Sequence, residues 1–136
     1  MTTRTLAVAG AALEAATGII LFTDPRLVVG LLIGASLSSG GVAVGRVCGI
    51  GLFSFGLACW PSRTALTTQA TSALFTYNLL SSLYIAYLGF NDGFGAYLLW
   101  PACILHASLA LLLARPAYEA LKDKWLAPSS QRAGMQ

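Results

Sequence analysis

The sequence predicts an all-α integral membrane protein built as a bundle of four membrane-spanning helices. The chain has 136 residues, of which 57% are hydrophobic and only 10% are charged, whereas an ordinary soluble domain carries about 25% charged residues. Four apolar segments are long enough to cross a hydrocarbon core of about 30 Å, which takes roughly 20 helical residues. These segments are Thr5–Thr23, Val42–Trp60, Gln69–Phe90 and Ala96–Ala114.

The first segment contains Glu14 as its one charged side chain. A cleaved signal peptide is the alternative interpretation of this N-terminus, because a short basic start precedes an apolar run. Glu14 interrupts that run, and apolar residues continue well beyond it. These features favour a retained membrane helix.

The stretch Leu27–Leu37 between the first two spans is apolar, but its 11 residues are too few to cross a bilayer. We expect a short re-entrant or interfacial helix here, which begins near Pro25 because proline favours the first turn of a helix. The Ser-Gly cluster at 38–41 should end it. The alternative is that this stretch lengthens the second span.

The second span combines small residues with a charge. Gly41, Gly45 and Gly49 recur every fourth residue and form a ridge that lets another helix approach closely. Arg46 lies within the same span, and an unpaired charge at the bilayer centre costs about 2.5–3.5 kcal/mol on insertion scales. Arg46 should therefore either pair with Glu14 or extend its long side chain to the outer headgroups.

The third and fourth spans contribute Asn78 and His106. Counted from the same membrane surface, Glu14, Asn78 and His106 lie roughly 12–14 Å deep, near the midplane, and Arg46 lies about 21 Å deep. Each span thus supplies one strongly polar side chain, and we predict that the four form a central polar site. Tyr77 is predicted to be a packing or interface residue.

The chain is divided into a four-span bundle at 1–115 and a cytoplasmic segment at 116–136. Pro116 is expected to begin a short helix along the membrane surface, since Tyr118, Leu121 and Trp125 share one face. The residues after this helix should form a flexible tail.

Two interpretations of Glu14, Arg46, Asn78 and His106 stay open. The cluster is either a hydrogen-bond network that fixes helix register or a site for a proton, a polar ligand or a quinone head group. No metal site is predicted, since Cys103 and His106 form only one potential pair of ligands. No cofactor is required; a quinone or haem is compatible with the sequence, although its single histidine cannot supply two haem ligands.

Two family resemblances follow from these features. The plan of four short helices, with a proline after the first span and RVCG at 46–49, resembles small bacterial DoxX-like membrane proteins, which implies an association with membrane redox or quinone chemistry. The stretch GAALEAATGIIL around Glu14 is similar to the first helix of small multidrug resistance transporters, in which a membrane glutamate couples a proton to a drug cation. This second likeness is confined to the first helix.

The sequence favours a non-enzymatic protein of the bacterial inner membrane. It has no P-loop, Rossmann fingerprint, HExxH or GxSxG motif. Its net charge of +3 reflects membrane topology, and no nucleic acid partner is expected. We predict a binding, transport-related or accessory subunit, with a redox protein that handles quinone or haem as the alternative. Besides the lipid bilayer, its partners would be a second copy, a larger membrane complex, or a small hydrophobic ligand or proton.

Charge asymmetry predicts the topology. In a four-span arrangement, six Lys and Arg residues lie on the side of both termini and Arg26 alone lies on the other, so the positive-inside rule places both termini in the cytoplasm. Reporter fusions at Arg63 and at the C-terminus should read cytoplasmic, and a fusion at Asp92 should read external. Any other pattern contradicts this topology.

Overall fold

The computed structural model describes residues 2–61, 68–91 and 95–126, and within them the chain forms five helices and no strand. All but the second are long and apolar enough to cross a membrane, which confirms the predicted four-helix membrane bundle. The helices are α1 (Thr3–Thr23), α2 (Pro25–Leu32), α3 (Ser39–Ala58), α4 (Thr68–Asn91) and α5 (Leu99–Leu126).

The short helix α2 follows the first span, as predicted, and is separate from the second span. It begins at Pro25, and the Asp24 carboxylate accepts a hydrogen bond from the Leu27 backbone N–H at 3.1 Å, which caps the helix. It ends two residues before Gly34, whose φ of +78° departs from helical geometry. Its 8 residues extend only about 12 Å, so α2 does not cross the membrane.

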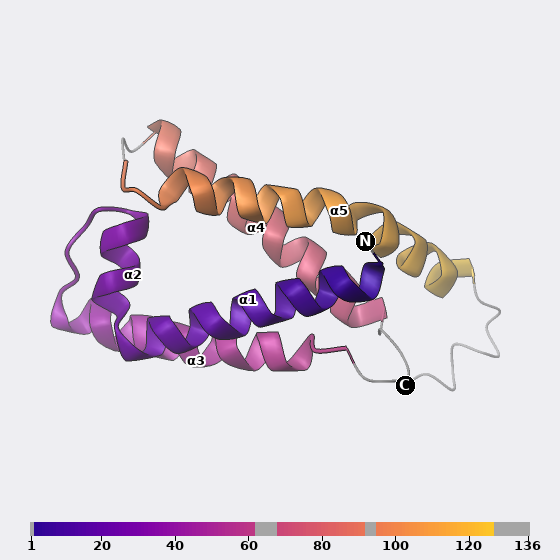
Figure 1. Cartoon of the computed structure of the whole chain (residues 1–136), viewed down its shortest axis with the longest axis horizontal. Coiled ribbons are helices and arrows are strands. Elements are labelled where there is room, and N and C mark those ends of the chain that lie inside the picture. Colours follow the sequence, from indigo (N-terminus) through magenta and orange to yellow (C-terminus); the bar gives the residue numbers. More distant parts are fainter. Residues whose placement is uncertain (1, 62–67, 92–94, 127–136) are drawn as a thin grey trace.

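The four spans form two antiparallel hairpins, in which α1 packs mainly on α3 and α4 mainly on α5 (Figure 1). At one end of the bundle, α2 lies between the hairpins, and Leu98 N–H donates to the Leu31 carbonyl at 2.9 Å. At the opposite end, the beginnings of α1 and α4 share an apolar core. The buried members of this core are Leu6, Ala7, Ala11, Cys59, Ala70, Leu74 and Leu113.

The two hairpins repeat one burial pattern although their sequences differ. The returning helices make matching contacts, since Gly49 of α3 lies against Gly18 and the Cys103 thiol of α5 donates to the Ser82 carbonyl at 3.5 Å. Glu14 and Asn78 hold equivalent positions. The buried residues Ala7, Gly10, Glu14 and Gly18 of α1 correspond in order to Thr71, Leu74, Asn78 and Ser82 of α4.

Large apolar side chains cover the outer faces of the bundle. Val47 is 68% exposed, Leu111 is 78% exposed and Phe90 is 76% exposed. A soluble monomer rarely exposes contiguous apolar surface on this scale. These faces therefore fit contact with lipid.

The backbones of α1 and α3 touch at glycine positions. A Cβ added at Gly49 would lie 2.5 Å from the Phe22 nitrogen and 2.7 Å from the Gly18 carbonyl oxygen. A Cβ at Gly56 would lie 2.7 Å from the Ala11 carbonyl oxygen. Only glycine permits this approach, because real Cβ atoms do not come so close to backbone atoms.

The predicted glycine ridge serves three different contacts. Gly49 faces α1, whereas a Cβ at Gly45 would meet the Pro25 Cβ of α2 at 2.8 Å. Gly41 lies beside its chain neighbours Leu37 and Ser38. Gly49 is thus the member that holds two spanning helices together.

No new helix begins at Pro116, because α5 continues through it. The C-terminal helix predicted to begin at Pro116 is thus the continuation of α5. Proline removes one backbone hydrogen bond, but the Arg115 Nε donates to the Glu119 carboxylate at 2.9 Å across this position, and such i,i+4 pairs support a helix. The 28 residues of α5 extend about 42 Å, so its end projects beyond the hydrocarbon core. The predicted flexible tail lies outside the described residues.

Substitution of Gly49 tests the backbone contact between α1 and α3. Gly49→Ala should destabilise the protein by about 1–3 kcal/mol, because the added methyl group overpacks against the backbone of α1. Gly51→Ala is the matched control, since open space surrounds Gly51 in the same helix; it should leave stability unchanged or raise it by up to about 1 kcal/mol through helix propensity. Thermal unfolding in detergent measures both. Equal stability of the two variants would contradict the contact.

Candidate functional site

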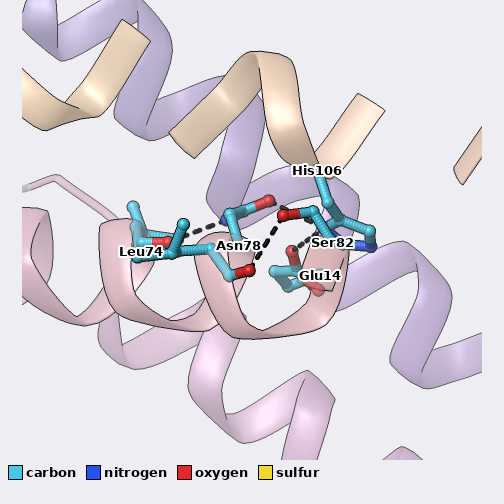
Figure 2. Close-up of polar contacts among 6 residues, drawn as sticks. Glu14, Leu74, Asn78, Ser82 and His106 are labelled. Carbon is cyan, nitrogen blue, oxygen red and sulfur yellow. Dashed lines mark hydrogen bonds and ion pairs between the residues drawn. The ribbon is translucent and has the colours of Figure 1, made fainter. Parts of the chain in front are cut away.

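Glu14 is buried at the place where the two hairpins meet. Glu14 is 1% exposed, and its carboxyl group lies beside Asn78 and Ser82 of α4 and His106 of α5 (Figure 2). Its carboxylate Oε1 lies 4.0 Å from His106 Nδ1, beyond hydrogen-bond distance. Within the described part of the chain, this oxygen has no hydrogen-bond partner.

Asn78 and His106 form a directed hydrogen-bond chain. The Asn78 Nδ2 donates to the Leu74 carbonyl at 2.9 Å, so the amide oxygen of Asn78 faces His106. His106 Nδ1 lies 2.8 Å from that oxygen and must be the donor, because an amide oxygen only accepts. Asn78, which is fully buried, therefore fixes the position of the imidazole ring.

One imidazole N–H thus faces two acceptors. His106 Nδ1 lies 2.8 Å from Asn78 Oδ1 and 4.0 Å from Glu14 Oε1. His106 is the one described basic side chain within ion-pair distance of Glu14. The His106 side chain is 14% exposed, so the ring lies at the edge of the buried cluster.

Tyr77 also belongs to the site, although its sequence context predicted a packing or interface residue. Tyr77 lies near the Glu14 carboxylate. Its ring lies 5.9 Å from the His106 ring in an edge-on arrangement and 5.2 Å from the ring of Phe55. The signal that could have identified it is Ser81, which follows Tyr77 by one helical turn and gives this face of α4 a second hydroxyl.

The structure does not place Arg46 with the other three predicted site residues. Arg46 is exposed on the outer face of α3, whereas Glu14, Asn78 and His106 meet inside the bundle. Among the described residues, Arg46 forms no ion pair with Glu14. The predicted alternative, in which Arg46 extends along the lipid face, matches this position.

The site is suited to proton and hydrogen-bond chemistry. It combines a carboxyl group, an imidazole, a phenol and an amide within a largely apolar interior. The described residues contain no group of three or more His, Cys, Asp or Glu side chains that could hold a metal ion. Bound ligands would be recognised here by hydrogen bonds and by the charge of Glu14.

The fold and the site define a small multi-pass membrane protein with a polar centre between two hairpins. No protein-family model matches the chain, and searches of curated proteins and of solved structures also found no match. The chemistry of the site is therefore the basis on which a function can be inferred.

Paired substitutions test the hydrogen bond between Asn78 and His106. Asn78→Ala and His106→Ala should each destabilise the protein, because each leaves a polar group unpaired in the interior. The double variant should lose less stability than the sum, by roughly 0.5–3 kcal/mol. Denaturant unfolding in detergent measures this coupling, and strict additivity would show that the bond does not form.

The same approach tests whether Arg46 contacts Glu14. Glu14→Gln and Arg46→Gln should be additive within about 0.5 kcal/mol, because the two residues share no contact. Unfolding of the two single variants and the double variant provides the measurement. A coupling as large as that between Asn78 and His106 would mean that Arg46 turns inward in the membrane.

Proposed function

We propose that this protein binds an exchangeable proton at Glu14 and acts as a binding, transport-related or accessory subunit in a membrane. The single observation that supports this proposal is the buried Glu14 Oε1 without a hydrogen-bond partner, 4.0 Å from His106 Nδ1. A buried polar atom left unpaired costs about 1–3 kcal/mol, and more when it is charged. A proton on this carboxyl group, or a ligand that donates to it, removes that cost.

The geometry around His106 suggests how proton exchange would be transmitted. With Glu14 protonated, the imidazole N–H remains on Asn78 Oδ1, where it lies now at 2.8 Å. With Glu14 ionised, a shift of the ring by roughly 1 Å toward Oε1 would form a charge-assisted hydrogen bond instead. The loss of one proton would thus move a side chain of α5 relative to α4.

The difference between the two hairpins supports a single exchangeable proton. Glu14 and Asn78 hold equivalent positions in α1 and α4, but an amide cannot ionise. Two carboxylates at these positions would repel each other. With asparagine at position 78, the pair of equivalent positions contains one titrating carboxyl group, and Asn78 is a fixed hydrogen-bond partner for His106.

The cellular setting is part of the proposal. The excess of Lys and Arg on the side of both termini favours an N-in, C-in topology in a bacterial inner membrane. Partner proteins or a second copy would contact the outer apolar faces of the helices. Intramembrane ionisable residues commonly mark proton or ligand paths, and this generality supports a transport-related role.

Redox work with a quinone is the second candidate. The observation that favours it is a row of three rings. The Tyr77 ring lies 5.2 Å from the Phe55 ring on one side and 5.9 Å from the His106 ring on the other. A quinone head group needs hydrogen-bond donors for its carbonyl oxygens and flat apolar side chains for its ring, and these three residues supply both. The DoxX-like plan of the sequence points in the same direction.

Infrared spectroscopy tests the proposed proton site. A difference spectrum between low and high pH should contain the band of a buried protonated carboxyl group, and Glu14→Gln should remove that band. Glu119→Gln is the matched control, since Glu119 is exposed and paired with Arg115, and the band should persist in it. A spectrum that Glu14→Gln leaves unchanged would refute proton binding at Glu14.

Two further measurements distinguish the roles. Proteoliposomes that contain an internal pH dye and carry a potassium gradient with valinomycin should take up protons through a transporter, and Glu14→Gln should abolish this uptake. An accessory subunit would show the infrared band without the uptake. A quinone that copurifies with the wild-type protein and is lost in Tyr77→Phe would favour the redox candidate.

A further inference from the structure

Arg46 lies in line with an apolar groove on the outer surface of the bundle. Gly49, Ile50 and Phe53 follow it by three, four and seven residues, so all four residues share one face of α3. The last three line the groove together with residues of α1. Its lining residues are Gly18, Ile19, Phe22, Gly49, Ile50 and Phe53.

The groove exists because two glycines bring α1 and α3 together. At Gly18 and Gly49 the backbones touch, so no side chain fills the surface above the contact, while Ile19 and Ile50 stand beside it and are 51% and 53% exposed. The resulting groove has a volume of about 280 Å³. In a bilayer, an exposed apolar surface of this kind lies against acyl chains.

Arg46 supplies charge at the end of this groove nearest α2. Helical side chains tilt toward the N-terminus of their helix, and α3 begins at the end of the bundle where α2 lies (Figure 1). Arg46 follows Ser39, the first residue of α3, by only about 10 Å along the axis. Its guanidinium can therefore extend to that membrane surface, as long basic side chains do.

The backbone of a second arginine, Arg26, lies near that of Arg46. Pro25 packs on Gly45, with the Pro25 Cβ 2.8 Å from the position of a Cβ at Gly45, and the next residues in the two segments are Arg26 and Arg46. Both arginines are exposed. Neither forms an ion pair among the described residues.

We propose that this surface binds an anionic phospholipid, with the lipid phosphate on Arg46 and one acyl chain in the groove between α1 and α3. Charge complementarity selects this occupant, because the lining of the groove is apolar and the exposed Arg46 lies about one helical turn beyond it, on the side of α2. Arginine forms strong, often paired hydrogen bonds to phosphate oxygens. Arg26 would add a second positive charge. This proposal is independent of the proton site at Glu14.

Native mass spectrometry tests the lipid site. Full-length protein is released from nanodiscs of phosphatidylcholine that contain a minor fraction of phosphatidylglycerol, and the lipids that stay bound are counted. The wild-type protein should retain phosphatidylglycerol in preference to phosphatidylcholine. Arg46→Gln should reduce this preference roughly tenfold, as expected for the loss of a charge-assisted hydrogen bond, whereas Arg46→Lys should keep part of it.

Two variants test whether lipid retention depends on the groove itself or on any exposed positive charge. Ile50→Trp should lower phosphatidylglycerol retention, because the larger side chain narrows the groove while Arg46 stays in place. Arg115→Gln is the matched control, since Arg115 is an exposed arginine of α5 paired with Glu119, and it should retain lipid as the wild-type protein does. Equal retention in Arg46→Gln and wild type would overturn the proposal. So would lipid-free wild-type dimers that Arg46→Gln abolishes, because a second copy would then occupy this surface.

Discussion

A carboxyl group with no access to water constrains this bundle more than any other feature. Glu14 is 1% exposed, and a charged or polar group in an apolar interior needs partners. The groups that face it come from other helices: Tyr77 on α4, and His106 on α5, whose Nδ1 lies 4.0 Å from Glu14 Oε1 without a hydrogen bond. The surroundings of this one side chain therefore involve three helices, α1, α4 and α5. Asn78 completes the arrangement, because it holds the imidazole at 2.8 Å.

The helices are held together by different interactions within a hairpin and between the hairpins. Within α1–α3, Gly18 and Gly49 allow backbone contact, and such small-residue packing is a main source of helix association where lipid removes the hydrophobic driving force. Between the hairpins, the contacts are fewer: the approach of Glu14 to His106, an apolar core near Leu6 and Leu74, and the backbone hydrogen bond from Leu98 to Leu31. A change of protonation at Glu14 would thus act on the weaker of the two kinds of interface.

Hydropathy predicted the four spans well, because length and composition determine whether a helix can cross a bilayer. Hydropathy alone does not determine which side chains meet: of the four polar residues predicted to form one site, Glu14, Asn78 and His106 come together and Arg46 does not. The depth of each residue along its helix placed Glu14 within reach of both His106 and Arg46. Which of the two lies beside Glu14 depends on how each helix is rotated about its axis, and depth gives no information about rotation. Tyr77 was missed for the same reason. The extent of α5 was missed because Pro116, a common helix boundary in water, is tolerated within a helix that neighbouring contacts support.

Glu14 and Arg46 show two solutions to the same physical problem, a charged residue in the sequence of a membrane helix. The side chain of glutamate is short, so near the midplane it cannot reach water and must find partners inside the bundle. The side chain of arginine is long and tilts toward the N-terminus of α3, so it can remain on the lipid face while its charge reaches the membrane surface. Side-chain length and direction, rather than charge alone, therefore decide why Glu14 belongs to the interior site and Arg46 to the surface of the bundle.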